Sequence, residues 1–450
     1  MGTLFGTDGI RGPANQHPMT AEMAVRVGRA VTTIFRAHKG NTKIIVGRDT
    51  RLSGHMLEAA MVAGICSAGG DAYLTGVIPT PGVAFSASST KAAAGIVISA
   101  SHNPFSDNGI KLFRGNGRKL SDKKEAEIEK LILDETSTER SQMNPETGTV
   151  NILDEACQNY ISFLKDTLPA NFSLNGFKVV LDCANGATFR TTPPLFSDLG
   201  AEVVALGVDP DGRNINHHCG SEHPKGLIRA VLETGSDIGL ALDGDGDRLI
   251  AVDERGDILS GDHILLICAN LMKRQGRLKN HCVVSTVMSN MGLSAALDKM
   301  GVRHERSKVG DRYVMEKMID CGAVIGGEDS GHMIFADCHT TGDGSLTALK
   351  LIEAIQLENK PLSELSRAMR PYPQVLINVE VRSKPDIESV SEIADAIESV
   401  ESELEGKGRV LVRYSGTQPI CRIMVEGPSK GDTQRYCKQI SDIICKNIGV

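Results

Sequence analysis

The feature that most constrains this 450-residue chain is an alternation of short apolar runs with amphipathic helical segments, which continues to about residue 370. Strands that alternate with helices form βαβ units and mainly parallel sheets. Near-continuous runs of Val, Ile and Leu are typical of strands that are covered on both faces. The expected strands are 43–49, 95–99, 178–186, 201–206, 238–243 and 282–287, and the expected helices include 21–38 and 265–275.

Polar and charged stretches divide the chain into four expected domains. They lie at 134–153, 253–262 and 370–374. After the last of them the pattern changes to that of a smaller α+β unit. Its expected elements are a strand at 375–381, a helix near 388–404, strands at 409–413 and 420–426, and a last helix. We therefore expect three tandem α/β modules with mainly parallel mixed sheets and a smaller C-terminal α+β domain. The expected boundaries are 1–153, 154–256, 257–370 and 371–450.

The composition argues against several classes of function. A formal net charge of −7 disfavours a nucleic-acid partner, which usually requires a basic surface. No apolar run reaches the roughly 18 residues of a membrane span, and the N-terminus carries no apolar signal segment. The eleven cysteines include no CxxC pair, which is typical of a reducing compartment. We therefore expect a cytoplasmic protein with no nucleic-acid and no membrane partner.

The strongest local motif is D-G-D-G-D-R at 243–248, which directly follows a predicted strand. Asp243, Asp245 and Asp247 alternate with glycines, so the three carboxylates can converge on one side. Like charges this close require a cation, and hard oxygen ligands favour Mg²⁺, Ca²⁺ or Mn²⁺. The alternatives are an EF-hand loop, an aspartyl-nucleophile phosphatase and a solvated acidic turn. The EF-hand is disfavoured because Arg248 stands where its glycine is required.

The stretch G-I-V-I-S-A-S-H-N-P-F-S-D-N-G-I-K at 95–111 ends a buried strand in an unusually polar loop. Three carboxylates leave an octahedral cation incomplete, and a phosphate oxygen would complete it. Ser101 would carry that phosphoryl group, and Lys111 would handle protons and charge. The alternative is that Ser101 and Asn103 cap a helix.

A second phosphate-handling loop is expected in V-R-Y-S-G-T-Q-P-I-C-R at 412–422. Arg413 and Arg422 supply guanidinium donors, while Ser415, Gly416 and Thr417 form a tight turn whose N–H groups can face one anion. The alternative is an ordinary β-hairpin.

Two further loops carry weaker signals. In I-G-G-E-D-S-G-H-M-I-F at 325–335, Glu328 and Ser330 are suited to sugar hydroxyls and His332 to a phosphate. The histidine-rich loop at 216–224 matches no usual structural zinc spacing, so we expect it to lie near the active-site cleft without metal.

Together these loops closely resemble the phosphohexomutase family of the α-D-phosphohexomutase superfamily. The resemblance covers essentially the whole chain, and its motifs occur in order. They are S-A-S-H-N-P at 99–104, D-G-D-G-D-R at 243–248, G-E-D-S-G-H at 327–332 and R-Y-S-G-T-Q-P at 413–419. Within the family, F-G-T-D-G-I-R-G at 5–12 and S-K-V-G-D-R-Y-V at 307–314 are most similar to the phosphoglucosamine mutases. Asp329 and Gln418 depart from the usual Gln and Glu of that subfamily, and both lie in substrate-reading loops.

The resemblance implies four domains around a central cleft, with Ser101 as the phosphoserine and Lys111 as general acid/base. The implied catalytic residues are Ser101, Lys111, Arg11 and His102, and the implied substrate-binding residues are Glu328, Ser330, His332 and Arg248. The distal phosphate would be bound by Arg413, Ser415, Gly416, Thr417 and Arg422. The implied Mg²⁺ ligands are Ser101, Asp243, Asp245 and Asp247.

The activity that the resemblance implies is interconversion of glucosamine 6-phosphate and glucosamine 1-phosphate through a phosphoserine and a bisphosphate intermediate. The product would feed UDP-N-acetylglucosamine and cell-wall precursor synthesis. Mg²⁺ and a hexose 1,6-bisphosphate primer, of glucosamine or glucose, are the implied cofactors, and the chain is expected to be a monomer or homodimer. The alternatives are a phosphomannomutase or phosphoglucomutase, a metal-dependent sugar phosphatase, and a non-catalytic sugar-phosphate binding protein.

Overall fold

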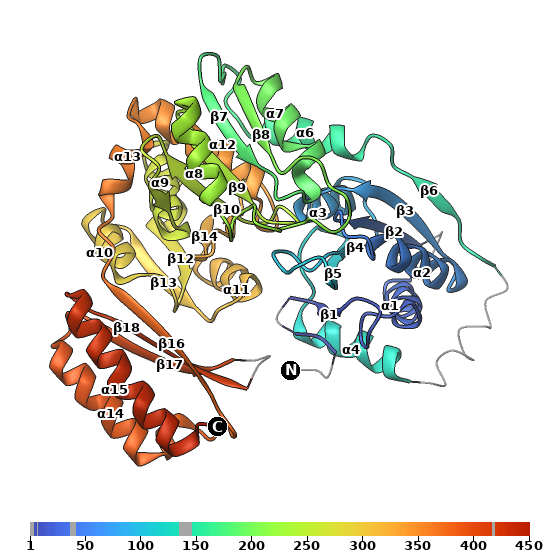
Figure 1. Cartoon of the computed structure of the whole chain (residues 1–450). Coiled ribbons are helices and arrows are strands. Elements are labelled where there is room, and N and C mark those ends of the chain that lie inside the picture. The colour runs from blue at the N-terminus through green and yellow to red at the C-terminus, as the bar shows by residue number, and fades with distance from the viewer. Residues whose placement is uncertain (1–3, 7, 37–41, 135–145, 416–418) are drawn as a thin grey trace. The chain divides into compact units, whose positions relative to one another are not determined.

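The computed structural model describes residues 4–6, 8–36, 42–134, 146–415 and 419–450 (Figure 1). Their contacts define two compact units. The larger unit comprises residues 1–288 and 302–368, and the smaller one comprises 289–301 and 369–450. Each unit is described by itself below.

The first sheet of the larger unit has the strand order β1-β5-β4-β2-β3-β6. Its central strands β4, β2 and β3 are parallel, whereas β5 runs antiparallel to β4. Apolar side chains such as Ile44, Val46 and Ile96 are fully buried, which explains the continuous apolar runs. The strands are β1 (Ile10–Pro13), β2 (Thr42–Arg48), β3 (Gly70–Val77), β4 (Ala94–Ile98), β5 (Asp107–Arg114) and β6 (Val150–Ile152); the helices are α1 (Ala21–Ile34), α2 (Gly54–Ser67), α3 (Thr80–Ser89) and α4 (Asp122–Leu133).

The second sheet has the order β11-β10-β9-β7-β8, and its β9 and β10 form an antiparallel hairpin. The acidic motif is the loop of that hairpin. Its strands are β7 (Lys178–Asp182), β8 (Glu202–Leu206), β9 (Ile238–Leu242), β10 (Leu249–Asp253) and β11 (Ile258–Leu259), with helices α6 (Ala156–Asp166), α7 (Thr192–Asp198) and α8 (Lys225–Thr234).

The third sheet has the order β13-β12-β14-β15, parallel except for β15. Its strands are β12 (Cys282–Thr286), β13 (Arg303–Ser307), β14 (Ile325–Gly327) and β15 (Met333–Phe335), with helices α9 (Gly261–Arg274), α11 (Asp311–Cys321), α12 (Gly344–Glu358) and α13 (Leu362–Leu365). Helix α10 (Met291–Lys299) lies between β12 and β13 in sequence but groups with the smaller unit.

Apart from α10, the smaller unit is an antiparallel three-stranded sheet with two helices packed side by side on one face (Figure 1). Ile423, Val425, Ile440 and Ile444 belong to the buried core between sheet and helices. The strands are β16 (Gln374–Glu380), β17 (Arg409–Tyr414) and β18 (Ile420–Glu426), and the helices are α14 (Ser391–Leu404) and α15 (Lys430–Ile448).

The predicted fold class is confirmed, and most predicted strands lie within one residue of their observed bounds. The strand predicted at 178–186 ends at Asp182, because the chain turns at Ala184 and Asn185, which both have positive φ. The segment predicted as a connector contains the short strand β6, which pairs with β3. Within the described residues, no helix is long and apolar enough to span a membrane.

Candidate active site

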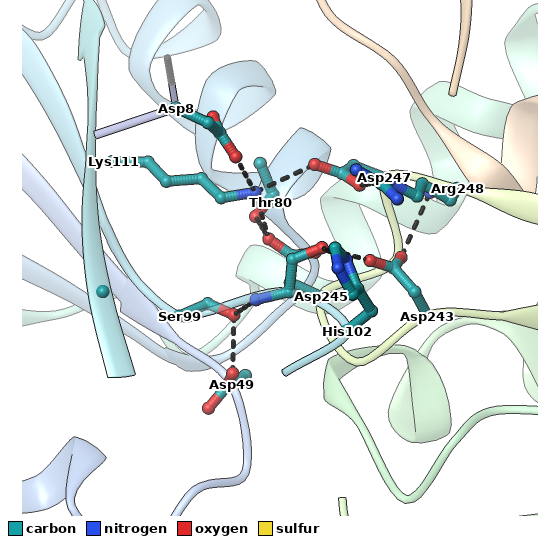
Figure 2. A network of polar contacts seen from close by, with 12 residues as sticks. Asp8, Asp49, Thr80, Ser99, His102, Lys111, Asp243, Asp245, Asp247 and Arg248 are labelled. Carbon is teal, nitrogen blue, oxygen red and sulfur yellow. Dashed lines mark hydrogen bonds and ion pairs between the residues drawn. The ribbon is translucent and has the colours of Figure 1, made fainter. Parts of the chain in front are cut away.

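Two loops and one strand of the larger unit meet in one buried polar cluster (Figure 2). Ser101 follows β4, Lys111 lies on the neighbouring strand β5, and the three aspartates follow β9. Ser101 has φ of +53°, a left-handed conformation that is uncommon for a residue with a side chain. No helix begins there, since residues 101–106 form turns that lead into β5. The interpretation of Ser101 as a helix cap is therefore wrong.

The three carboxylates of the acidic loop converge and are buried. Asp243, Asp245 and Asp247 are 0%, 1% and 3% exposed, and each offers a ligand atom within 4.8 Å of the others. Burial excludes a solvated acidic turn, and the strands on both sides exclude an EF-hand, which requires helices.

This carboxylate cluster fits a hard divalent cation. In the described part of the chain, the buried Oδ1 atoms of Asp245 and Asp247 have no hydrogen-bond partner. Buried carboxylate oxygens without a partner are costly, and a cation would satisfy them. Burial, together with the charges of Asp247 and Asp245, raises the pKa of Asp243 well above its usual value, and a bound cation would oppose that shift.

Ser101 lies in direct contact with the acidic loop. Its Oγ donates to Asp243 Oδ2 at 2.5 Å. A side chain at Gly244 would place its Cβ 2.6 Å from the Ser101 carbonyl oxygen, so only glycine permits this approach. Gly244 therefore lets the serine loop and the carboxylates come together.

Lys111 lies among carboxylates rather than in solvent. Its Nζ is 2.7 Å from Asp245 Oδ2, 2.9 Å from Asp247 Oδ2 and 3.2 Å from Asp8 Oδ2. Figure 2 shows Lys111 reaching toward these side chains. Burial opposes the charge, but Asp245 and Asp247 raise the pKa of Lys111 well above its usual value. Lys111 is therefore protonated and places a proton donor within the cluster.

Asp8 and Lys119 extend this cluster, and the sequence analysis missed both. Asp8 pairs with Arg11, Lys111 and Lys119, and Lys119 also lies 2.5 Å from Asp311 Oδ2 at the start of α11. Asp8 stands in the motif F-G-T-D-G-I-R-G, so that motif offered a signal for it. Nothing about Lys119 in the sequence distinguished it from other lysines.

Three further predicted residues, His102, Arg248 and His332, surround the acidic loop. Nδ1 of His102 is 3.4 Å from Ser101 Oγ, and burial together with the charge of Arg248 lowers the pKa of His102 to about 4. The backbone N–H of Arg248 donates to Asp243 Oδ1 at 3.1 Å. The ring nitrogens of His332 lie 3.6 Å from Asp247 Oδ1 and 3.4 Å from Asp311 Oδ2. These carboxylates raise the pKa of His332 although burial opposes it.

The two predicted sugar-reading residues differ in their surroundings. Oε1 of Glu328 accepts from the backbone N–H of Gly310 at 2.9 Å, which brings the segment 307–314 against the motif at 327–332. Ser330 is exposed.

The histidine-rich loop contributes no metal centre. Within the described residues, the metal-ligating cluster is formed by the three aspartates, and the histidines of 216–224 do not converge into another. Instead Asn216 reaches the Ser101 loop, where its Nδ2 donates to the Ser101 carbonyl at 2.9 Å.

In the smaller unit, the predicted phosphate loop is the turn of the β17–β18 hairpin. Arg413 and Arg422 are register partners on these strands, and burial together with the Arg422 charge lowers the pKa of Arg413. Nζ of Lys384 donates to the Ser415 carbonyl at 2.7 Å, which adds a third cation that sequence reasoning missed. Gly416 and Thr417 lie outside the described residues.

Comparison with known proteins gives one family over the whole chain. Models of the four phosphoglucomutase/phosphomannomutase domains match: the α/β/α domains I, II and III at residues 2–139, 158–256 and 260–372, and the C-terminal domain at 376–443. Phosphoglucosamine mutases from Syntrophus aciditrophicus and Syntrophobacter fumaroxidans are each 56% identical over all of this chain and all of their own.

Solved structures show the same fold at lower identity. A phosphoglucomutase/phosphomannomutase family protein from Burkholderia thailandensis superposes with a TM-score of 0.80 at 24% identity, covering 99% of each chain. Aspergillus fumigatus N-acetylphosphoglucosamine mutase, solved with GlcNAc-6P and magnesium, gives a TM-score of 0.66 at 17% identity, covering 98% of this chain and 96% of its own. With the full-length identity to bacterial relatives, these matches show that the chain belongs to the phosphoglucosamine mutases of the phosphoglucomutase/phosphomannomutase family.

Proposed function

We propose that this enzyme interconverts glucosamine 6-phosphate and glucosamine 1-phosphate by passing a phosphoryl group through Ser101. The observation that carries the proposal is the 2.5 Å contact of Ser101 Oγ with Asp243 inside the buried carboxylate cluster, beside the protonated Lys111. A hydroxyl held against one carboxylate of a cation site, whose other carboxylates bind an ammonium group, is placed to form and lose a phosphate ester.

Asp243, Asp245 and Asp247 would hold Mg²⁺, with an oxygen of the Ser101 phosphate as a further ligand. The ion would supply Lewis-acid polarisation of the phosphoryl group and neutralise its charge. The buried Oδ1 atoms of Asp245 and Asp247, which have no hydrogen-bond partner among the described residues, support this assignment.

In the forward reaction, the anomeric hydroxyl of glucosamine 6-phosphate attacks phosphorus as the bond from phosphorus to Ser101 Oγ breaks. The hydroxyl loses a proton and Ser101 Oγ gains one, so a 1,6-bisphosphate and free serine result. Lys111 holds a proton beside Asp245, and His102 is neutral at pH 7, so this pair can donate and accept the protons that move. Arg11, which pairs with Asp8, is assigned to the charge of the transferring group.

The second half requires the bisphosphate to turn, so that its 6-phosphate returns to Ser101 and leaves the 1-phosphate. We assign the phosphate that is not reacting to Arg413, Ser415, Gly416, Thr417 and Arg422 of the C-terminal domain. A trace of hexose 1,6-bisphosphate serves as primer, because it phosphorylates Ser101 when that group is lost.

We assign sugar and phosphate recognition in the third α/β domain to Glu328, Ser330 and His332, and we add Arg248 from the metal loop. We retain domains 1–153, 154–256, 257–370 and 371–450 as carriers of the phosphoserine, the metal, sugar recognition and phosphate binding. The central cleft, the cytoplasmic location and the monomeric or homodimeric state stay predictions.

A ³¹P NMR time course with glucosamine 6-phosphate, Mg²⁺ and trace glucose 1,6-bisphosphate tests the activity. We expect the 6-phosphate and 1-phosphate signals to reach equilibrium with no inorganic phosphate. Stoichiometric release of inorganic phosphate would identify a phosphatase, and unchanged signals despite ligand-induced stabilisation would identify a binding protein.

The same assay tests the sugar preference. A kcat/KM for glucose 1-phosphate or mannose 1-phosphate that equals that for glucosamine 1-phosphate would contradict the amino-sugar assignment.

A further inference from the structure

Beneath the Ser101 loop lies a fully buried arginine that the mechanism above does not use. Arg51 is 0% exposed and follows β2. Its Nη2 donates to the carbonyl oxygens of Ser101 and Asn103, both at 2.8 Å. Its Nη1 donates to the carbonyl of Asp107 at 3.0 Å and to that of Pro104. One guanidinium group therefore binds the backbone of the whole loop that carries Ser101.

Asn216, from the second α/β domain, binds the same two carbonyl oxygens. Its Nδ2 lies 2.9 Å from the Ser101 oxygen and 3.0 Å from the Asn103 oxygen. A carbonyl oxygen has two lone pairs, so the donors from Arg51 and Asn216 saturate both acceptors. Two domains thus fix the same two peptide groups.

The N–H side of Ser101 is held as well. Ser99 Oγ accepts from the Ser101 N–H at 3.0 Å and donates to Asp49 Oδ2 at 2.6 Å. The same carboxylate oxygen accepts from Arg51 Nε at 2.8 Å. Both peptide groups that flank Ser101 are therefore tied to one buried network.

This network has a specific consequence for the reacting hydroxyl. Ser101 is in the left-handed region, which a serine occupies only where its surroundings impose it. That conformation aims Oγ at Asp243. Relaxation of φ toward the common regions would move Oγ away from Asp243.

We propose that Arg51 and Asn216 are positioning residues for phosphoryl transfer, which hold the Ser101 backbone so that its Oγ faces the carboxylate cluster. The inference rests on the proposed role of Ser101 as phosphoryl carrier. Arg51 and Asn216 bind the loop through its carbonyl groups, and sugar recognition is assigned to other residues. Their loss should therefore lower kcat and leave KM for glucosamine phosphate largely unchanged.

Asn216→Asp is the first test, because aspartate keeps the size of the side chain but cannot donate to the two carbonyls. Asn214→Asp is the matched control in the same loop, since Asn214 Nδ2 donates to the Asp209 carbonyl at 2.9 Å and not to the Ser101 loop. We expect Asn216→Asp to lower kcat by about 100-fold, as displacement of a reacting group by about 1 Å does. KM should stay close to that of the control, and kcat is compared at a temperature at which both variants are fully folded, because a carboxylate at the buried position 216 lowers Tm.

Arg51→Lys is the second test, paired with Arg48→Lys as control. Arg48, the last residue of β2, stands three residues before Arg51 and pairs with Glu58 at 3.1 Å instead of binding the loop carbonyls. A lysine ammonium cannot reproduce the forked donors of Arg51, so kcat should fall more than in the control. If Arg51→Lys does not fold, the positioning role is tested by Asn216→Asp alone.

The decisive readout is the rate at which glucose 1,6-bisphosphate phosphorylates Ser101, followed by intact mass. We expect it to fall in parallel with kcat in Asn216→Asp. Equal kcat and phosphorylation rates in Asn216→Asp and Asn214→Asp would overturn the inference, and so would a loss of activity fully explained by lower Tm or raised KM. Ser101→Ala is measured alongside: if it turns over substrate, the proposed relay fails, whereas an inactive Ser101→Ala with an unaffected Asn216→Asp refutes only the positioning role.

Discussion

Two polar regions of this molecule handle charge in opposite ways. Around Ser101, cations and carboxylates alternate and are buried together: Lys111 contacts three carboxylates, and Lys119 bridges Asp8 and Asp311. In the β17–β18 hairpin of the smaller unit, Arg413 stands opposite Arg422, and Lys384 binds the nearby turn. Among the described residues, the Nε atoms of both arginines are buried without a hydrogen-bond partner.

This difference in charge pairing suits the Ser101 region to phosphoryl transfer and the β17–β18 hairpin to binding of an anionic ligand. A site that makes and breaks a phosphate ester must keep its geometry in every step, and the ion pairs of Lys111 and Lys119 fix much of that geometry, while the carboxylate oxygens that they leave unpartnered among the described residues remain for a cation. Opposed like charges on a sheet are unfavourable unless something neutralises them. The two arginines of the hairpin therefore repel each other, and a bound phosphate dianion would relieve that repulsion.

Ser101→Ala should have the largest effect on activity of all the substitutions. Loss of isomerisation in this variant would locate phosphoryl transfer in the region around Ser101. The hydroxyl is the proposed covalent acceptor, so isomerisation should be abolished. Intact mass after bisphosphate treatment should show one phosphate on the wild type and none on the variant. Full turnover by the alanine variant would refute the distinction between the two regions.

Much of the fold could be predicted because its signals are local. The apolar runs of β2, β4 and β9 specify buried strands, and alternation with helices specifies parallel connections. The grouping of α10 with the smaller unit could not be predicted, since it depends on packing between segments distant in sequence.

Site residues that cluster in the sequence could be predicted, whereas those that stand apart in the sequence could not. Asp243, Asp245 and Asp247 carry a recognisable spacing. Arg51 and Asn216 act through backbone carbonyls, which leave no trace in sequence spacing, although R-D-T-R at 48–51 is an unusual charged ending for a buried strand.

Asp245→Asn should cut turnover by about 100-fold and shift half-activation to higher Mg²⁺, because one of three charged ligands is lost. Activity measured over a Mg²⁺ titration checks this. Asp257→Asn, an exposed carboxylate beyond the same hairpin, serves as control and should behave like the wild type. An unchanged Mg²⁺ dependence in Asp245→Asn would exclude the acidic loop as the metal site.

Removing a cation should have opposite effects on the stability of the two regions. Without Mg²⁺, Lys111→Met leaves buried carboxylates unpaired and should lower the free energy of unfolding by about 3 kcal/mol. Arg422→Met removes a like-charge pair and should stabilise the smaller unit by up to about 1 kcal/mol while raising KM. Hydrogen exchange of each unit in EDTA checks both, and equal destabilisation of the two units would contradict the comparison.

Mild acid should remove one stabilising contribution from the larger unit, that of a buried histidine of a kind that the smaller unit lacks. The segments 289–301 and 369–450 contain no histidine. In the larger unit, His339 Nδ1 accepts from the Thr340 N–H at 2.7 Å, and Nε2 is 3.1 Å from the Pro81 carbonyl. Burial lowers the pKa of His339 to about 4.

A histidine with a lowered pKa takes up its proton more readily when the chain is unfolded. Its contribution is therefore fully present above its unfolded pKa of about 6.5 and is lost as the pH falls toward 4. Between about pH 7.5 and about pH 5.5, this should cost about 1 kcal/mol of the free energy of unfolding.

The measurement is the pH dependence of that free energy in wild type and His339→Gln, with the exposed His217→Gln as control. The difference between variants is required because burial raises the pKa of Glu125 to about 8 and that of Asp343 to about 6, and both shifts stabilise the larger unit as the pH falls. The dependence should become shallower in His339→Gln and should not change in His217→Gln. An unaltered slope in His339→Gln would show that His339 is not the source, and that the two units do not differ in their response to acid for this reason.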